Sequence, residues 1–101
     1  MLSESQFTAE LKSYAEQLGF KCWRVHQTRR KPKEHIDKGF SDLVCVGHGT
    51  ILFVETKVGQ NTLDVAQEEF RDAVRGCGGS FWCIRSKEEF FDMGKLSGWW
   101  R

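Results

Sequence analysis

Residues 39–57 read GFSDLVCVGHGTILFVETK, and this stretch decides the fold. Two mostly apolar segments, residues 40–46 and 50–57, are separated only by Gly47-His48-Gly49. A short glycine-rich connection between two such segments is typical of a β-hairpin. The stretch therefore predicts two adjacent antiparallel strands.

Two further strands and three helices are expected around this hairpin. Residues 20–27 (FKCWRVHQ) and 80–85 (SFWCIR) are rich in aromatic and β-branched side chains and predict strands. Ser3, Asp64 and Ser86 are each followed three residues later by Gln or Glu, which is the capping-box pattern of a helix start. The last strand returns through a helix and should lie parallel to a neighbour by a right-handed crossover. We therefore expect an α/β fold of order αβββαβ plus a terminal helix, with a mixed four-stranded sheet flanked by helices.

Length and composition indicate one folded domain spanning residues 1–101. Hydrophobic residues make up 40% and charged residues 29%, which excludes a disordered chain. No apolar run approaches the roughly 20 residues that a membrane-spanning helix needs. The first ten residues lack the basic and apolar regions of a signal peptide. We expect a soluble, cytoplasmic protein with no membrane partner.

The net charge of +1 hides a basic segment. Residues 21–38 contain seven Lys and Arg side chains but only two acidic ones. Such a segment is either a solvated loop or a surface that contacts phosphates. The residues that we consider candidates for nucleic-acid binding are Arg24, Arg29, Arg30, Lys31, Lys33 and Lys38.

Charged side chains gather at one end of the predicted hairpin. The two-residue period of a strand places Glu55 and Lys57 on one face. Alone, this pair is equally consistent with a salt-bridged strand tip. However, the hairpin also carries Glu55 back beside Asp42, and two carboxylates held close repel unless a cation lies between them. A hard divalent ion fits that position, where it would polarise a phosphodiester and lower the pKa of a bound water. Lys57 would orient the attacking hydroxide or neutralise the growing phosphate charge.

The arrangement resembles the PD-(D/E)XK nuclease superfamily, and more closely the virus-type replication-repair nuclease (VRR-NUC) domain in its stand-alone, phage-like form. The segments that carry the resemblance are GFSD (39–42), FVETK (53–57), the D-x-x-Q of residues 64–67 and GCGGSFWCIRS (76–86). The chain departs from the pattern at Ser41, where many members have proline, and at Thr56, where a branched apolar residue is usual. The resemblance implies a restriction-endonuclease-like fold.

The resemblance also implies roles for individual residues. Asp42 and Glu55 would be metal ligands, with the Thr56 carbonyl as a further metal contact. Lys57 would be the catalytic lysine. The implied cofactor is Mg²⁺ or Mn²⁺.

Two further residues have alternative interpretations. Gln67 would support the site, although as the third residue after Asp64 it is also explained by a helix cap alone. The family places an acidic residue on the first helix, which Glu4 fits best and Glu10 fits second. Glu4 is also explained by a favourable interaction with the helix dipole.

The function implied is a metal-dependent, structure-specific DNA endonuclease that acts on branched DNA, with the four-way Holliday junction as the expected substrate and a phage as a possible source. The same chemistry could act on flaps or linear DNA, and a restriction-type enzyme would need a target-recognition segment that we do not find. A catalytically silent DNA-binding or regulatory module is the alternative from another class.

A homodimer is expected, because one chain holds one candidate site whereas symmetric junction resolution needs two nicks. The aromatic residues proposed as an intersubunit surface are Phe90, Phe91, Trp99 and Trp100. Folding of these side chains over their own subunit is the alternative. Three other aromatic residues are interpreted as core or sheet-face residues rather than base-stacking platforms: Trp23, Phe81 and Trp82.

Overall fold

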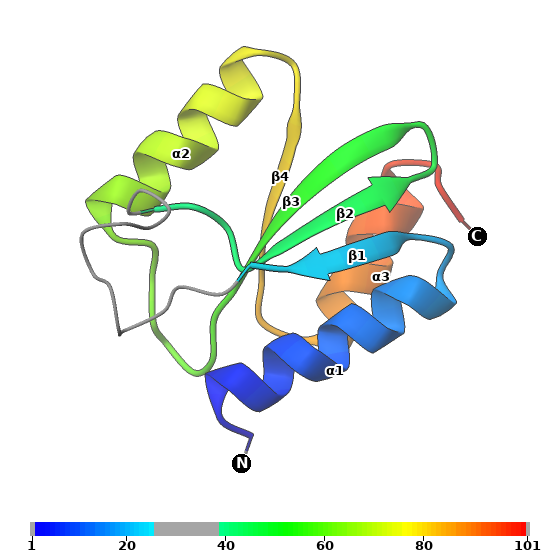
Figure 1. Cartoon of the computed structure of the whole chain (residues 1–101), viewed down its shortest axis with the longest axis horizontal. Coiled ribbons are helices and arrows are strands. Elements are labelled where there is room, and N and C mark those ends of the chain that lie inside the picture. The colour runs from blue at the N-terminus through cyan, green and yellow to red at the C-terminus, as the bar shows by residue number, and fades with distance from the viewer. Residues whose placement is uncertain (1, 26–38, 101) are drawn as a thin grey trace.

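The computed structural model describes residues 2–25 and 39–100 (Figure 1). In chain order these residues form α1 (Glu4–Gln17), β1 (Lys21–Arg24), β2 (Leu43–Gly47), β3 (Thr50–Thr56), α2 (Val65–Gly76), β4 (Ser80–Ile84) and α3 (Lys87–Leu96). The predicted order of elements is therefore confirmed. None of the helices in these two ranges combines the length and apolar character needed to cross a bilayer.

The strands of the described residues form one mixed sheet in the order β1-β2-β3-β4. β1 pairs antiparallel with β2, and β2 pairs antiparallel with β3. β4 pairs parallel with β3 after the crossover through α2, as expected from a strand that returns through a helix. In Figure 1, α1 and α3 lie on one side of the sheet and α2 lies on the other.

Local sequence signals account for the turns and helix starts. His48 and Gly49 both have positive φ (51° and 77°), and they connect a hairpin in which Gly47 pairs with Thr50. Positive φ at both central residues is the conformation of a type I′ turn, which matches the twist of the flanking strands. The capping boxes predicted at Ser3 and Asp64 are complete, with both reciprocal hydrogen bonds present.

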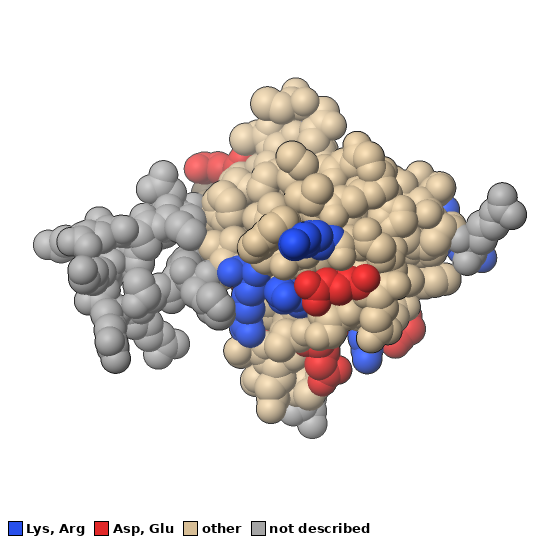
Figure 2. Space-filling view, turned by 45° about the vertical axis from the view of Figure 1, so that its right-hand side comes forward, with Lys and Arg blue, Asp and Glu red and all other residues tan. Residues whose placement is uncertain are grey.

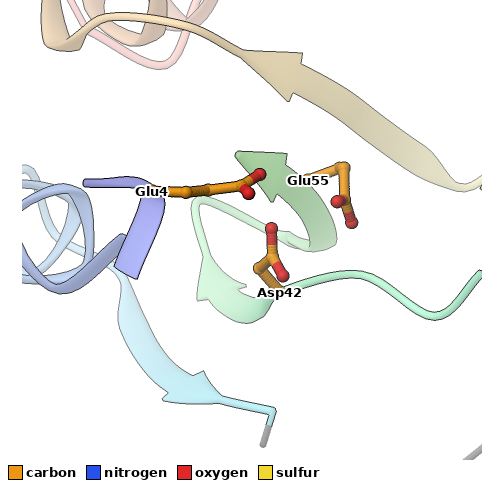
Figure 3. A group of neighbouring side chains, drawn as sticks. All are labelled: Glu4, Asp42 and Glu55. Carbon is orange, nitrogen blue, oxygen red and sulfur yellow. The ribbon is translucent and has the colours of Figure 1, made fainter. Parts of the chain in front are cut away.

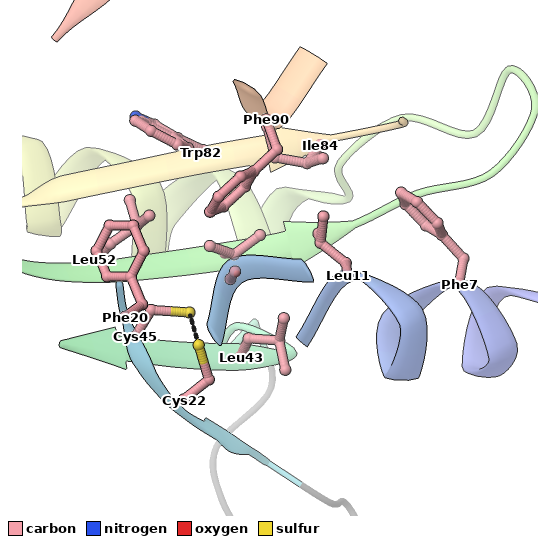
Figure 4. Packing of buried hydrophobic residues seen from close by; sticks show 12 residues of the cluster. Phe7, Leu11, Phe20, Cys22, Leu43, Cys45, Leu52, Trp82, Ile84 and Phe90 are labelled. Carbon is pink, nitrogen blue, oxygen red and sulfur yellow. Dashed lines mark hydrogen bonds between the residues drawn. The ribbon is translucent and has the colours of Figure 1, made fainter. Parts of the chain in front are cut away.

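The main core lies between the sheet and helices α1 and α3 (Figure 4). Leu11 of α1, Leu43, Leu52 and Ile84 of the sheet and Phe90 of α3 are completely buried in it. Burial of apolar area at about 25 cal/mol per Å² is the main stabilising contribution of this layer. The core therefore holds the first turns of α1 close to the start of β2 and the end of β3.

The C-terminal aromatic residues pack within their own chain. The Trp99 ring stacks on Trp82 with centroids 5.0 Å apart, and the Trp100 ring stacks on Phe90 at 5.9 Å. The Trp100 indole N–H donates to the Phe91 carbonyl oxygen at 2.9 Å. These contacts are the ones expected from the alternative, in which the side chains fold over their own subunit, and Phe91, Trp99 and Trp100 remain partly exposed.

Candidate metal centre

Three carboxylates from distant parts of the sequence meet at one end of the sheet (Figure 3). Glu4 begins α1, Asp42 immediately precedes β2, and Glu55 is the second-last residue of β3. One oxygen from each carboxylate lies within 4.8 Å of the other two. Glu10 is not part of this cluster; its Oε1 lies 3.6 Å from Lys87 Nζ on the exposed surface. Of the two alternatives on the first helix, the structure brings Glu4 to the site.

The strand boundary at Asp42 differs from the prediction. The sequence predicts Asp42 inside a strand, whereas β2 begins at Leu43. Ser41 is buried and its hydroxyl donates to the Leu43 carbonyl oxygen at 2.9 Å, which bends the backbone just before the strand. The Asp42 carbonyl oxygen still accepts from the Val25 N–H at 2.9 Å. Asp42 is therefore held beside β1 although it lies outside the regular strand.

Thr56 orients the Asp42 carboxylate. Asp42 Oδ2 accepts from the Thr56 backbone N–H at 2.9 Å and from the Thr56 hydroxyl at 2.8 Å. The Thr56 hydroxyl also contacts the hydroxyl of Thr8, which donates to the Glu4 carbonyl oxygen at 2.8 Å. These contacts link the first turn of α1 to the end of β3. The sequence analysis missed them, although a polar residue at a buried strand position was the available signal.

Glu55 is the most buried acidic residue of the cluster, with 2% of its surface exposed. Its Oε2 accepts from Gln67 Nε2 at 3.0 Å and lies 3.8 Å from Lys57 Nζ. Its Oε1 is buried and has no hydrogen-bond partner among residues 2–25 and 39–100. Burial, reinforced by the Asp42 carboxylate and opposed by Lys57, raises the pKa of Glu55 to about 8. Without a metal ion beside it, Glu55 therefore carries a proton at neutral pH even with Lys57 nearby.

The Gln67 side chain makes hydrogen bonds both to the helix cap and to the cluster. Its Oε1 accepts from the Asp64 N–H at 2.9 Å, and its own backbone N–H donates to Asp64 Oδ1 at 2.8 Å. Its Nε2 donates to Glu55. The two ends of one amide thus complete the helix cap and orient a carboxylate of the cluster.

The donor set fits a hard divalent cation. Three carboxylates supply oxygen ligands, which Mg²⁺, Mn²⁺ and Ca²⁺ prefer, and the cluster contains no His or Cys of the kind typical of zinc sites. A buried oxygen without a partner is costly, and a bound cation would satisfy it. Lys57 lies one residue past β3, where its backbone N–H donates to the Ile84 carbonyl oxygen at 3.1 Å. Its backbone is thereby anchored to β4, and its ammonium group lies beside Glu55.

Of the basic residues predicted to bind nucleic acid, only Arg24 belongs to the described part of the chain. Its Nη2 donates to Ser5 Oγ at 2.8 Å, which holds the guanidinium beside the residue that follows Glu4. The other five residues, Arg29, Arg30, Lys31, Lys33 and Lys38, lie outside the described residues. Among the described residues on the face seen in Figure 2, Lys and Arg side chains lie interspersed with Asp and Glu.

A solved protein structure is similar to this fold. The structure is similar to that of Hjc, a Holliday junction resolvase from the archaeal hyperthermophile Archaeoglobus fulgidus, with a TM-score of 0.57 and 20% sequence identity. The chain shares the fold of this resolvase. The match covers 78% of the chain and 64% of the resolvase, so the chain spans less than two thirds of the protein it matches. No family model and no curated protein matches the sequence.

Proposed function

We propose that this chain is a metal-dependent endonuclease of the VRR-NUC type that cleaves branched DNA, with the four-way junction as its main substrate. The observation that supports it most strongly is the Glu4, Asp42 and Glu55 cluster beside Lys57, with a buried carboxylate oxygen that lacks a partner. The fold shared with a Holliday junction resolvase supports the choice of branched DNA. A shared fold does not by itself assign a function, so the proposal rests on the residues of the site.

Asp42 and Glu55 would hold Mg²⁺ or Mn²⁺, together with Glu4 and the Thr56 carbonyl oxygen. When bound, such an ion neutralises charge on the scissile phosphate and makes a water more acidic. Thr56 and Gln67 keep the two ligand carboxylates oriented, because each donates a hydrogen bond to one of them. Lys57 places a positive charge beside the phosphate, where negative charge grows in the transition state.

A homodimer completes the proposal, because two scissile bonds related by symmetry need two sites. The C-terminal aromatic residues no longer support it, so the proposal rests on the symmetry of the reaction alone. Sedimentation at micromolar concentration measures the mass in solution. A monomer that resolves four-way junctions at full rate would overturn the dimer and favour single nicks in flaps.

The function is tested with end-labelled four-way, flap, splayed-arm and linear DNA, each incubated with Mg²⁺, Mn²⁺ or EDTA. We expect symmetric nicks in the four-way junction with either metal and none in EDTA. Asp42→Asn is the inactive control, and Glu10→Gln is the matched active control because Glu10 is an exposed carboxylate on the same helix as Glu4. Metal-independent binding without nicks in any substrate would instead support the catalytically silent module.

A further inference from the structure

In the described part of the chain, the helices leave part of one sheet face uncovered. On the face opposite the main core, α2 covers β3 and β4, with the Phe70 ring 5.3 Å from Phe53 and 5.9 Å from Phe81. Beyond α2, three large apolar side chains remain exposed, with Trp23 at 51%, Val46 at 42% and Ile51 at 54% of their surface. Of the two predicted positions for Trp23, core or sheet face, the structure shows the sheet face, with the indole ring half exposed.

Trp23 is a neighbour of the candidate metal centre. It pairs with Val44, and the Val25 N–H bonds to the Asp42 carbonyl oxygen at 2.9 Å, so the pairing of β1 continues to Asp42. In this backbone register, Trp23 and Asp42 are diagonal neighbours. Diagonal neighbours lie about 7–8 Å apart. Consecutive bases of one DNA strand are about 3.4 Å apart along the helix axis, so the indole is within about two nucleotides of a phosphate at Asp42.

Positive charge flanks the indole ring. Lys21 Nζ lies 5.9 Å from the Trp23 ring centroid, and Lys21 projects from the same face of β1 as Trp23. An occupant that fits this surface has a planar ring to cover the indole and a phosphate to meet the Lys21 ammonium. A nucleic-acid strand has both groups in alternation. A second copy of the chain would leave the Lys21 ammonium beside an apolar contact, which makes it the weaker candidate.

We propose that Trp23 is a stacking residue for an unpaired base next to the scissile phosphate. This inference rests on the proposed function and deepens it, because it assigns a residue to the recognition of DNA branches. In continuous duplex, every base face is covered by its neighbours in the helix. At a branch point or in a single strand, a base can leave its stack and lie on an aromatic side chain. Trp23 therefore favours branched and single-stranded DNA over unbroken duplex.

The test measures binding in EDTA, where the chemistry of cleavage does not contribute. The probes are a fluorescent four-way junction, a single strand and a duplex of equal length. We expect Trp23→Ala to weaken binding of the junction and the single strand about 5- to 100-fold, as for loss of one base–aromatic stack, and to change duplex binding less than 2-fold. Trp23→Phe should retain most of the affinity, and Trp23→Leu should behave like Trp23→Ala because it keeps apolar area without an aromatic face. Ile51→Ala is the matched control, since Ile51 is equally exposed on the same face but further from the carboxylates.

Tryptophan fluorescence distinguishes base stacking from a purely structural role of Trp23, because a structural role does not predict quenching by DNA. Single-stranded DNA should quench the emission of the wild-type protein, and Trp23→Phe should lose that quenching while the emission of Trp82, Trp99 and Trp100 remains. Equal binding of the single strand by wild type and Trp23→Ala would overturn the inference, even if the wild type nicks junctions with Mg²⁺. A halved mass for Trp23→Ala in sedimentation would also overturn it, because the face would then be an interface between two copies. Stacking by a wild-type protein that nicks no DNA would support the inference while the proposed function fails.

Discussion

Replacing Glu55 with glutamine should stabilise the metal-free protein while it abolishes cleavage. The buried Glu55 carboxyl has a pKa of about 8 in the folded protein, against an ordinary value of 4.5. A carboxyl whose pKa is raised on folding makes its full contribution to stability below the unfolded value, and that contribution is lost as pH rises toward the folded value. Glutamine stays neutral at every pH, and its amide oxygen can still accept the hydrogen bond from Gln67.

The size of the effect follows from the two pKa values. The raised pKa of Glu55 lowers the free energy of unfolding by about 1 kcal/mol at pH 5, about 3 kcal/mol at pH 7 and close to 5 kcal/mol at pH 9, at roughly 1.4 kcal/mol per pKa unit. The wild-type protein should therefore lose about 4 kcal/mol relative to Glu55→Gln between pH 5 and pH 9. Added Mg²⁺ should restore much of that loss in the wild type only, because a ligand that binds the folded state stabilises it.

Urea unfolding in EDTA at pH 5, 7 and 9 measures these differences for the wild type, Glu55→Gln and the control Glu10→Gln. Glu10 is an exposed carboxylate, so its replacement should leave the pH dependence of the wild type unchanged. If the stability of Glu55→Gln follows that of the wild type in parallel over this pH range, Glu55 is not the buried, proton-binding group described above. A Mg²⁺ response that survives in Glu55→Gln would remove Glu55 from the metal ligands.

Three further predictions concern the remaining parts of the site. Asp42→Asn and Lys57→Ala should each reduce the cleavage rate on the order of a hundredfold or more while junction binding in EDTA stays within a few fold, and near-normal turnover of either variant would refute its role. Thr56→Val should weaken metal affinity or activity roughly 10- to 100-fold because it removes the hydroxyl donor to Asp42, whereas Thr56→Ser should keep it, as metal titration followed by thermal unfolding would show. Neutralising the basic segment should lower the slope of log K against log salt by roughly 0.9 per lost phosphate contact on duplex arms, and an unchanged slope would place the segment in solvent. The residues to be replaced together in that variant are Arg29, Arg30, Lys31 and Lys33.

Features that depend on a few neighbouring residues were predictable from the sequence. The hairpin turn and the capping boxes at Ser3 and Asp64 involve groups at most three residues apart, and they were predicted where they occur. At Ser86 only the hydroxyl half of the predicted box forms, because Glu89 Oε1 accepts from the Arg85 N–H instead. The hairpin then brought Asp42 and Glu55 together, since its turn fixes the register. Contacts between distant elements were not predictable: the hydroxyl contact of Thr8 with Thr56 joins α1 to β3. The packing of Trp99 on Trp82 likewise depends on how α3 crosses the sheet.

The dual use of Gln67 links the order of a helix to the chemistry of a carboxylate. Unwinding the first turn of α2 breaks the cap to Asp64 and the hydrogen bond to Glu55 in one event, because the two ends of one amide make them. A cap contributes only about 1 kcal/mol, so this turn can open far more often than the whole protein unfolds. A cation that fixes Glu55 opposes that opening. Slower exchange of the amide hydrogens at the start of α2 would then report that the metal centre is filled, at a position outside the set of ligands.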